Sequence, residues 1–321
     1  MEDAGVRPIS CLQFNWHQLK PNTLLLVNRE FLVDLFQKCI EKAGNLNRFC
    51  HASGLTYPSI YHFLNGRIHF ISIHKLRVIL DYLGFPYSVA DSKILEVRKG
   101  KLASVVSPHF PIDLNCPDMG TLLGHIVSDG SIYVDLQRNH LRTKYTNSDS
   151  ELIDRFLDAT RRVFGNVHHT SEPTRGSFTI RFGSEMVGVA LAAAGAMVGN
   201  KTKQNGDLPW LVREGKEAIK IAYLRAAFSD EGSVGASNGF PYLILTRYYT
   251  IPPTVDRVFL SQFDCLMRSS VFPTGHIRMC MSLRRVITCA NASDGFPSEL
   301  FSLLIAVQEN KTTKSSWTAI Y

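Results

Sequence analysis

The chain has 321 residues, 45% of them hydrophobic and 20% charged, with a formal net charge of +7 and a pI near 9.0. This length leaves room for two or three domains, and the uncharged, apolar run at residues 186–200 is too short for a membrane span. The basic balance favours a polyanionic partner, while seven scattered cysteines without a CxxC pair argue against a disulfide-rich secreted protein and lead us to expect a cytoplasmic location.

The first predicted unit, residues 28–85, follows an N-terminal extension at 1–27 and has helical periodicity. FLVDLFQKCIEKAG predicts a helix that ends at Gly44. LNRFCHASGLTYPSIYHFLNGR predicts two short helices around a turn, with Thr56 as the cap of the second helix, and HKLRVILDYLG predicts another.

Two short helices joined by a glycine-containing turn resemble the helix-turn-helix of Cro/repressor-type DNA-binding domains. The resemblance implies an all-α DNA-binding domain in which SIYHFLNGR is the recognition helix and its exit. The side chains expected to contact DNA are Arg48, Tyr57, Ser59, Tyr61, His62 and Arg67. A small helical bundle that binds protein is the alternative.

Residues 86–117 contain four prolines and the basic group Arg98-Lys99-Lys101, which favours a linker. Its lysines would either follow a DNA backbone or keep a connector solvated.

The next unit begins with TLLGHIVSDGSIYV, an apolar helix that ends in Ser-Asp-Gly and continues as a strand. The pattern from here to residue 198 predicts helix, strand, strand, helix, strands and a final Ala-rich helix at 184–198.

The helix that ends in an acid followed by glycine occurs twice. LLGHIVSDGSI is matched about a hundred residues later by LRAAFSDEGSV, so that Asp129 and Glu231 occupy equivalent positions. One such helix end is common turn chemistry, but two copies at the separation of a domain indicate an internal duplication.

These two motifs, and the order of elements between them, resemble the LAGLIDADG homing endonuclease family over residues 118–321. The resemblance implies an α+β fold: two αββαββα subdomains, here residues 118–221 and a shorter 222–321, related by a pseudo-two-fold axis in a monomer. It further implies that the two sheets lie over double-stranded DNA and that Asp129 and Glu231 bind the divalent metal ions that serve strand cleavage.

The residues suit that chemistry. Small side chains at Gly124, Ser128, Ala226 and Ala227 allow the motif helices to approach closely. Two like carboxylates that meet at one axis are costly unless a cation neutralises them, which favours Mg²⁺. Bound metal would activate water for phosphodiester hydrolysis.

Polar strand residues are expected to contact bases: Tyr133, Gln137, Arg142, Lys144 and Arg181. The family often places a basic residue near the scissile phosphates, and Lys201 and Lys203 are the candidates by position. A solvated loop after a helix explains these two lysines equally well.

Three departures from the family pattern bear on activity. Val127 and Ser229 stand where the motif often has an additional acid, and Asp230 stands where a small residue is usual. The leading hypothesis is therefore a Mg²⁺-dependent, site-specific DNA endonuclease. The alternatives are an inactive regulator built on the same scaffold and an RNA intron-splicing helper.

Overall fold

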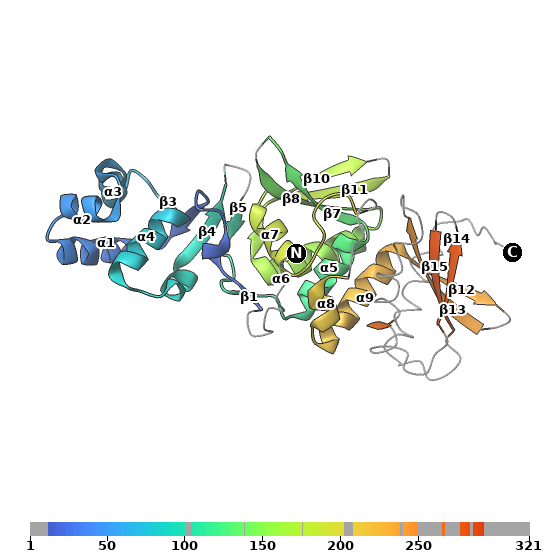
Figure 1. Ribbon diagram of the computed structural model, residues 1–321. Coiled ribbons are helices and arrows are strands. Elements are labelled where there is room, and N and C mark those ends of the chain that lie inside the picture. Colours follow the sequence, from blue (N-terminus) through green and yellow to red (C-terminus); the bar gives the residue numbers. More distant parts are fainter. Residues whose placement is uncertain are drawn as a thin grey trace.

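The computed structural model describes residues 12–99, 104–137, 139–174, 176–201, 208–237, 240–248, 265–266, 277–282 and 285–291, the strands after residue 232 by their backbone alone. Figure 1 shows the elements in a row, with an N-terminal helical module at one end, a helix-backed sheet in the middle and a second sheet at the other end. None of the helices in the described part of the chain combines the length and apolar character needed to cross a bilayer.

Four helices form the N-terminal module: α1 Arg29–Ala43, α2 Leu46–Ser53, α3 Tyr57–Leu64 and α4 Ile73–Leu83. Their starts are fixed by side-chain caps, because Asn28, Asn45 and Ser72 each accept a hydrogen bond from a backbone N–H in the first turn. The helices predicted from the sequence are confirmed, although Thr56, at the cap position of α3, makes no side-chain capping bond.

The N-terminal module is not all-α as predicted, because it carries strands. A five-stranded antiparallel sheet has the order β3-β2-β4-β5-β9. Its strands are β2 Leu24–Val27, β3 Phe70–Ser72, β4 Ile94–Arg98, β5 Ser104–Val106 and β9 Asn166–Val167. A short two-stranded sheet pairs β1 Gln13–Phe14 with β6 Ile112–Asp113.

The stretch predicted as a linker is therefore largely structured. It holds the 3₁₀ helix η2 Tyr87–Lys93 and the strands β4, β5 and β6. Strand β5 pairs with β9, which lies far along the chain, so this stretch connects the module to the next unit through backbone hydrogen bonds. The boundaries of the individual domains remain predictions.

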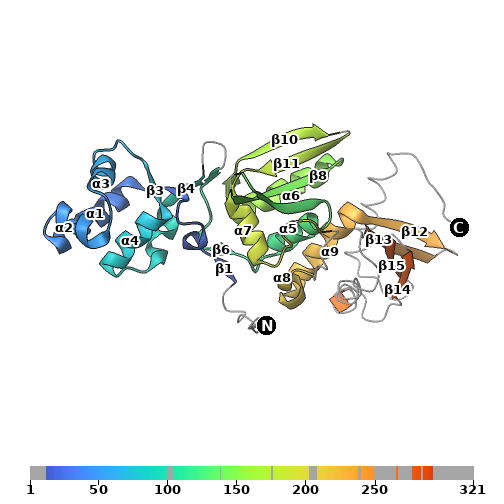
Figure 2. The same ribbon diagram turned by 45° about the horizontal axis from the view of Figure 1, so that its top comes forward.

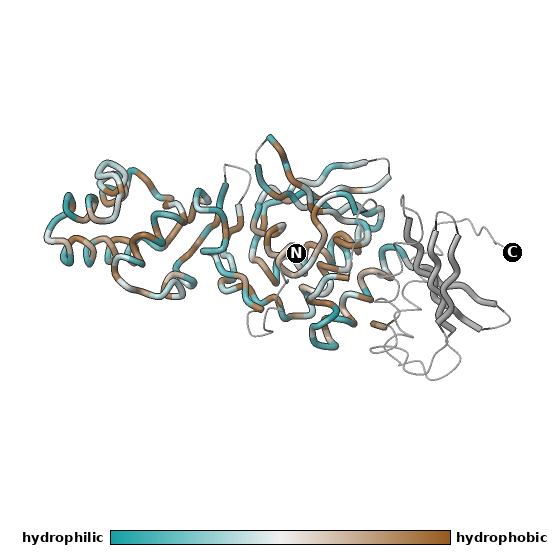
Figure 3. Tube along the Cα trace, in the orientation of Figure 1, coloured by the Kyte–Doolittle hydropathy of each residue, from teal (hydrophilic) through white to brown (hydrophobic). Residues whose placement is uncertain are grey.

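The middle unit has the predicted order of elements, αββαββα. The elements are α5 Pro117–Val127, β7 Gly130–Asp135, β8 His140–Asn147, α6 Ser150–Phe164, β10 His169–Thr174, β11 Ser177–Phe182 and α7 Glu185–Ala193. The antiparallel sheet has the order β10-β11-β8-β7, and its helices lie on one face (Figure 2). Apolar residues, brown in Figure 3, are concentrated in these inner helices and in the core of the N-terminal module.

One local prediction for this unit is wrong. The Ala-rich helix ends at Ala193 and not at residue 198, because the chain turns at Gly195 with φ of +100°. The strand after Asp129 ends at Asp135, and Leu136 in the following turn is 88% exposed.

The C-terminal part repeats this plan in its backbone. After α8 Trp210–Glu214, the long helix α9 Glu217–Glu231 leads directly into β12 Gly232–Ser237. Together with β13 Phe240–Tyr248, β14 Ile277–Ser282 and β15 Arg285–Asn291 it forms a sheet of order β12-β13-β15-β14. When the strands of each sheet are numbered in chain order, both four-stranded sheets have the order first, second, fourth, third. In both, the first strand starts at a glycine that directly follows an acidic residue.

Candidate functional site

The two motif helices, α5 and α9, pack side by side because glycine allows their backbones to meet. A Cβ added to Gly120 would lie 2.4 Å from the carbonyl oxygen of Ile219, and one added to Gly124 would lie 2.6 Å from the Cβ of Ala226. Gly124 and Ala226 therefore lie at the helix interface as predicted, and Gly120 joins them one turn earlier. The small side chain of Ala227 is also buried on this helix.

The end of α5 positions Asp129. The helix stops at Ser128, whose N–H still donates to the carbonyl of Gly124, and Asp129 follows as an exposed residue before β7 starts. Ser128 is thus a helix terminus as well as a small residue near α9. A carboxylate at the C-terminus of a helix faces the negative end of the helix dipole and is not stabilised by it.

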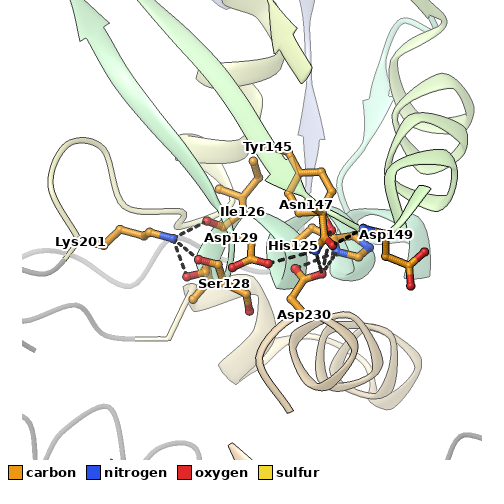
Figure 4. A network of polar contacts seen from close by, with 10 residues as sticks. His125, Ile126, Ser128, Asp129, Tyr145, Asn147, Asp149, Lys201 and Asp230 are labelled. Carbon is orange, nitrogen blue, oxygen red and sulfur yellow. Dashed lines mark hydrogen bonds and ion pairs between the residues drawn. The ribbon is translucent and has the colours of Figure 1, made fainter. Parts of the chain in front are cut away.

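Lys201 caps the C-terminal end of α5. Its Nζ donates to the carbonyl oxygens of Ile126 at 3.1 Å, Val127 at 2.8 Å and Ser128 at 2.5 Å (Figure 4). An ammonium group has three N–H donors, and all three are used here. Lys201 therefore acts as a cap that compensates the helix dipole, and the geometry does not favour the predicted contact with a scissile phosphate. Lys203 lies outside the described residues.

Asp230, near the end of α9, reaches across to the first motif helix. Its side chain is fully buried, and its Oδ2 lies 3.0 Å from Nδ1 of the buried His125 on α5. The hydroxyl of Tyr145 on β8 donates to Oδ1 at 2.7 Å. The hydrogen bond is made by the His125 tautomer that carries a proton on Nδ1 when it donates to an Asp230 carboxylate oxygen. This polar contact joins the two motif helices inside their interface.

Asn147 connects that buried contact to Asp129. Its amide nitrogen lies 3.0 Å from Oδ2 of Asp129 and 3.4 Å from Oδ1 of Asp230. The amide oxygen accepts from the backbone N–H of Asp149, which fixes the amide orientation. Figure 4 shows the resulting chain of side chains, from His125 through Asp230 and Asn147 to Asp129.

The electrostatics of the site are dominated by the two acids. Partial burial, followed by the charge of Asp230, raises the pKa of Asp129 to about 6, and the positive charge of Lys201 opposes this rise. Burial and the same Asp230 charge raise the pKa of Tyr145, which stays a neutral hydrogen-bond donor. The site thus concentrates negative charge at an exposed carboxylate, the arrangement that attracts a cation.

Some of the carboxylate oxygens at this site suit a hard divalent cation, and others are already used in hydrogen bonds. Asp129 is accessible, whereas Asp230 is buried and its oxygens already accept hydrogen bonds, which leaves Asp129 and the half-buried Glu231 as possible ligands. Among the described residues no three His, Cys, Asp or Glu side chains are grouped to hold a metal ion. The fit is therefore to an ion such as Mg²⁺ that binds one or two carboxylates and completes its shell with phosphate oxygens and water.

The predicted base-contacting residues of the first sheet share its outer face. The register places Ser131 opposite Lys144 and Lys144 opposite Arg181, with Tyr133 opposite Arg142 on the same face. Ion pairs join Arg142 to Asp135 at 2.9 Å and Arg181 to Glu172 at 3.1 Å. Gln137 is exposed in the turn after β7 and lies beyond the strand.

The predicted DNA-contacting residues of the N-terminal module differ in exposure. Tyr57 and Tyr61 on α3 are exposed and stack with ring centroids 5.8 Å apart. Arg48 and Arg67 are exposed, while Ser59 and His62 are only partly so. The hydroxyl of Ser59 donates to the carbonyl of Thr56.

Four participants in the site were missed or left open by sequence reasoning: His125, Tyr145, Asn147 and Asp230. Asp230 was recognised only as an acid where a small residue is expected. No spacing signal marks the other three: His125 is one more residue of the motif helix α5, and Tyr145 and Asn147 on β8 reach the helix ends through tertiary packing alone.

Comparisons with known proteins found similarity to solved structures only. No family model matches the chain, and no curated protein matches it. Solved structures similar to it include the homing endonuclease I-DmoI in complex with DNA and Mn (14% identity, TM-score 0.39, covering 60% of this chain and 94% of that one). Others are I-WcaI bound to its DNA recognition sequence (13%, 0.36, 60% and 80%) and the LAGLIDADG meganuclease I-AabMI bound to uncleaved DNA (16%, 0.35, 58% and 82%). At these values the likeness carries no weight for function, which we base on the chain's own residues.

Proposed function

We propose that the protein is a site-specific DNA-binding protein that hydrolyses phosphodiester bonds of double-stranded DNA with a divalent cation. One observation carries the proposal: helices α5 and α9 pack through glycine, and the exposed Asp129 after α5 is joined through Asn147 to Asp230 near the end of α9. A protein that only binds DNA gains nothing from acids that face phosphate, because like charges repel. A cation held between those acids and a phosphate reverses that repulsion.

Each residue has a role in this proposal. Asp129 and Glu231 hold Mg²⁺, which when bound polarises the phosphodiester and lowers the pKa of coordinated water. Asn147 keeps the Asp129 carboxylate in place through its 3.0 Å hydrogen bond. Lys201 fixes the end of α5, and the outer face of the first sheet contacts bases and phosphates.

The test uses a library of randomised DNA duplexes incubated with the protein and Mg²⁺, followed by sequencing of the cut ends. We expect recurrent cleavage at one sequence family, and at least about hundredfold less with Asp129→Asn or Glu231→Gln. Asp158→Asn is the matched control, because Asp158 is exposed on α6 and pairs with Arg161 outside the site. Cleavage that persists in both site variants would contradict the assigned roles.

A second candidate, a regulator that binds DNA without cutting it, is favoured by the exposed Tyr57–Tyr61 face of α3 in a helix-turn-helix-like pair. The same library separates the two. Selective enrichment of intact duplexes, with no cut ends at any Mg²⁺ concentration, would leave the regulator and remove the nuclease.

A further inference from the structure

The N-terminal module is joined to the first sheet-and-helix unit by backbone pairing. Val105 and Val106 of β5 pair with Val167 and Asn166 of β9, the strand that directly follows α6. The N–H of His168 also donates to the carbonyl of Ser104. This pairing resists rotation of the two units, but it involves only two residue pairs and acts as a hinge unless a second contact fixes it.

A buried acid holds the two units together a second time. Glu185, the first residue of α7, is only 5% exposed, yet two lysines from the N-terminal module reach it. Lys20 lies 2.7 Å from Oε1, and Lys99 lies 3.0 Å from Oε2. Lys20 also donates to the carbonyl of Asn139. Each carboxylate oxygen therefore has its own cation, and removal of both lysines would leave a buried, unpaired charge.

Helix α3 lies on the same side of the molecule as the first sheet. Figures 1 and 2, which differ by a rotation of 45°, both show α3 and strands β8, β10 and β11 on the upper side, with α4 and α7 below them. The tyrosine pair supplies exposed aromatic surface on α3, and two exposed arginines lie near it in the chain, Arg48 on α2 and Arg67 just after α3. These are the groups that nucleic acid binds.

From these observations we infer that α3 and the first sheet bind one continuous DNA duplex at a fixed spacing. The ion-paired group of Glu185, Lys20 and Lys99, called the clasp below, holds the two units at this spacing. A module on a flexible tether would tolerate targets in which its subsite is moved. A module locked through a shared sheet and two ion pairs tolerates only the spacing that its geometry defines. The inference rests on the proposed function insofar as both require DNA binding.

The test uses the Asp129→Asn variant with Mg²⁺, so that the DNA stays intact, on a duplex enriched from the randomised library. Footprinting first defines the protected segments, and then 1, 2, 5 or 10 base pairs are inserted between the segment at α3 and the segment at the sheet. An insertion of 5 base pairs turns one subsite to the opposite side of the duplex, because B-DNA repeats about every 10.5 base pairs. We expect at least about a tenfold loss of affinity with 1 to 5 base pairs inserted.

Variants of the clasp provide the second measurement. In Glu185→Gln, and in the double variant Lys20→Gln/Lys99→Gln, which alters only partly exposed side chains, the loss caused by insertion should shrink to about threefold or less. Glu151→Gln, which removes an ion pair within α6, should keep the full loss. An unchanged loss in both clasp variants would refute the role of Glu185.

The outcomes distinguish the inference from the proposed function. Equal affinity for all insertions, or protection at the sheet without a second protected segment, would overturn the fixed spacing while leaving cleavage by the unsubstituted protein intact. Cleavage absent in the unsubstituted protein, together with a spacing-sensitive footprint, would overturn the nuclease and keep the inference. Absence of any protected segment would overturn both.

Discussion

The burial of Asp129 and the like charge of Asp230 predict that a substitution at Asp129, the proposed metal ligand, will stabilise the metal-free protein. Asp129→Asn replaces an ionised carboxyl, whose pKa is raised from 3.8 to about 6, with a neutral group of the same shape. The Asn147 amide can still donate to the new side-chain oxygen, since its bond to Asp129 Oδ2 is 3.0 Å long. The substitution therefore removes a partly buried charge and its repulsion with Asp230, and it keeps the hydrogen bond.

The magnitude follows from the shift in pKa. A rise of about two units corresponds to roughly 3 kcal/mol against the ionised native state above pH 6. Asp129 is exposed on its solvent side, so screening reduces this cost, and we expect a gain of about 1 kcal/mol, or an increase in Tm of about 2 °C.

The sign depends on pH in a defined way. Because the native pKa lies above the unfolded one, the cost is absent below about pH 4 and complete above about pH 6. The difference in Tm between Asp129→Asn and the unsubstituted protein should therefore vanish at pH 4.

Thermal unfolding in EDTA at pH 4.0 and 7.5 measures both effects. Asp118→Asn is the control, because Asp118 pairs with both Nε and Nη2 of Arg162, at 2.9 and 2.8 Å, and its loss should lower Tm. Added Mg²⁺ should raise the Tm of the unsubstituted protein but not that of Asp129→Asn. A lower Tm for Asp129→Asn than for the unsubstituted protein at pH 7.5 would refute the reasoning.

Three further predictions concern the scaffold. Gly124→Val should lower the free energy of unfolding by about 3 kcal/mol or prevent folding, because even a Cβ would lie 2.6 Å from the Cβ of Ala226. Urea unfolding measures this, and a loss below about 1 kcal/mol would contradict the close helix contact. Lys201→Gln should lower Tm by about 1 to 3 °C through loss of the helix cap, whereas a direct phosphate contact would leave Tm unchanged and weaken the salt dependence of DNA binding. Burial raises the pKa of Cys39 to about 12, so Cys39 should resist iodoacetamide at pH 8 while the exposed Cys265 reacts. Mass spectrometry of tryptic peptides measures this, and labelling of both cysteines at equal rates would contradict the buried position of Cys39.

Helical periodicity and turn residues suffice for much of the fold. The order of elements from residue 117 to residue 193 and the helices of the N-terminal module follow from the sequence, because they are long or are bounded by residues such as Gly44 and Gly54. Strands β5 and β9 are different. They have three and two residues, too few to show a period, and they pair across a long stretch of chain.

The residues of the candidate site also differ in how far the sequence predicts them. Asp129 and Glu231 were selected from the repeated acid-glycine pattern, which local sequence shows directly. The position of Asp230 depends on how α9 crosses α5, and that crossing is set by contacts such as Gly120 against Ile219. Consecutive residues at a helix end point about 100° apart, so a sequence alone does not show which acid turns inward.

The shared sheet also orders the events of folding during synthesis. Strands β2, β3, β4 and β5 leave the ribosome well before β9, which lies at residues 166–167 beyond the whole of α6. Until that segment emerges, β5 has an open edge that other chains are able to pair with. The N-terminal module, although made first, therefore reaches its final form only together with the unit that follows it, and the interval between them is when the nascent chain is most exposed to aggregation.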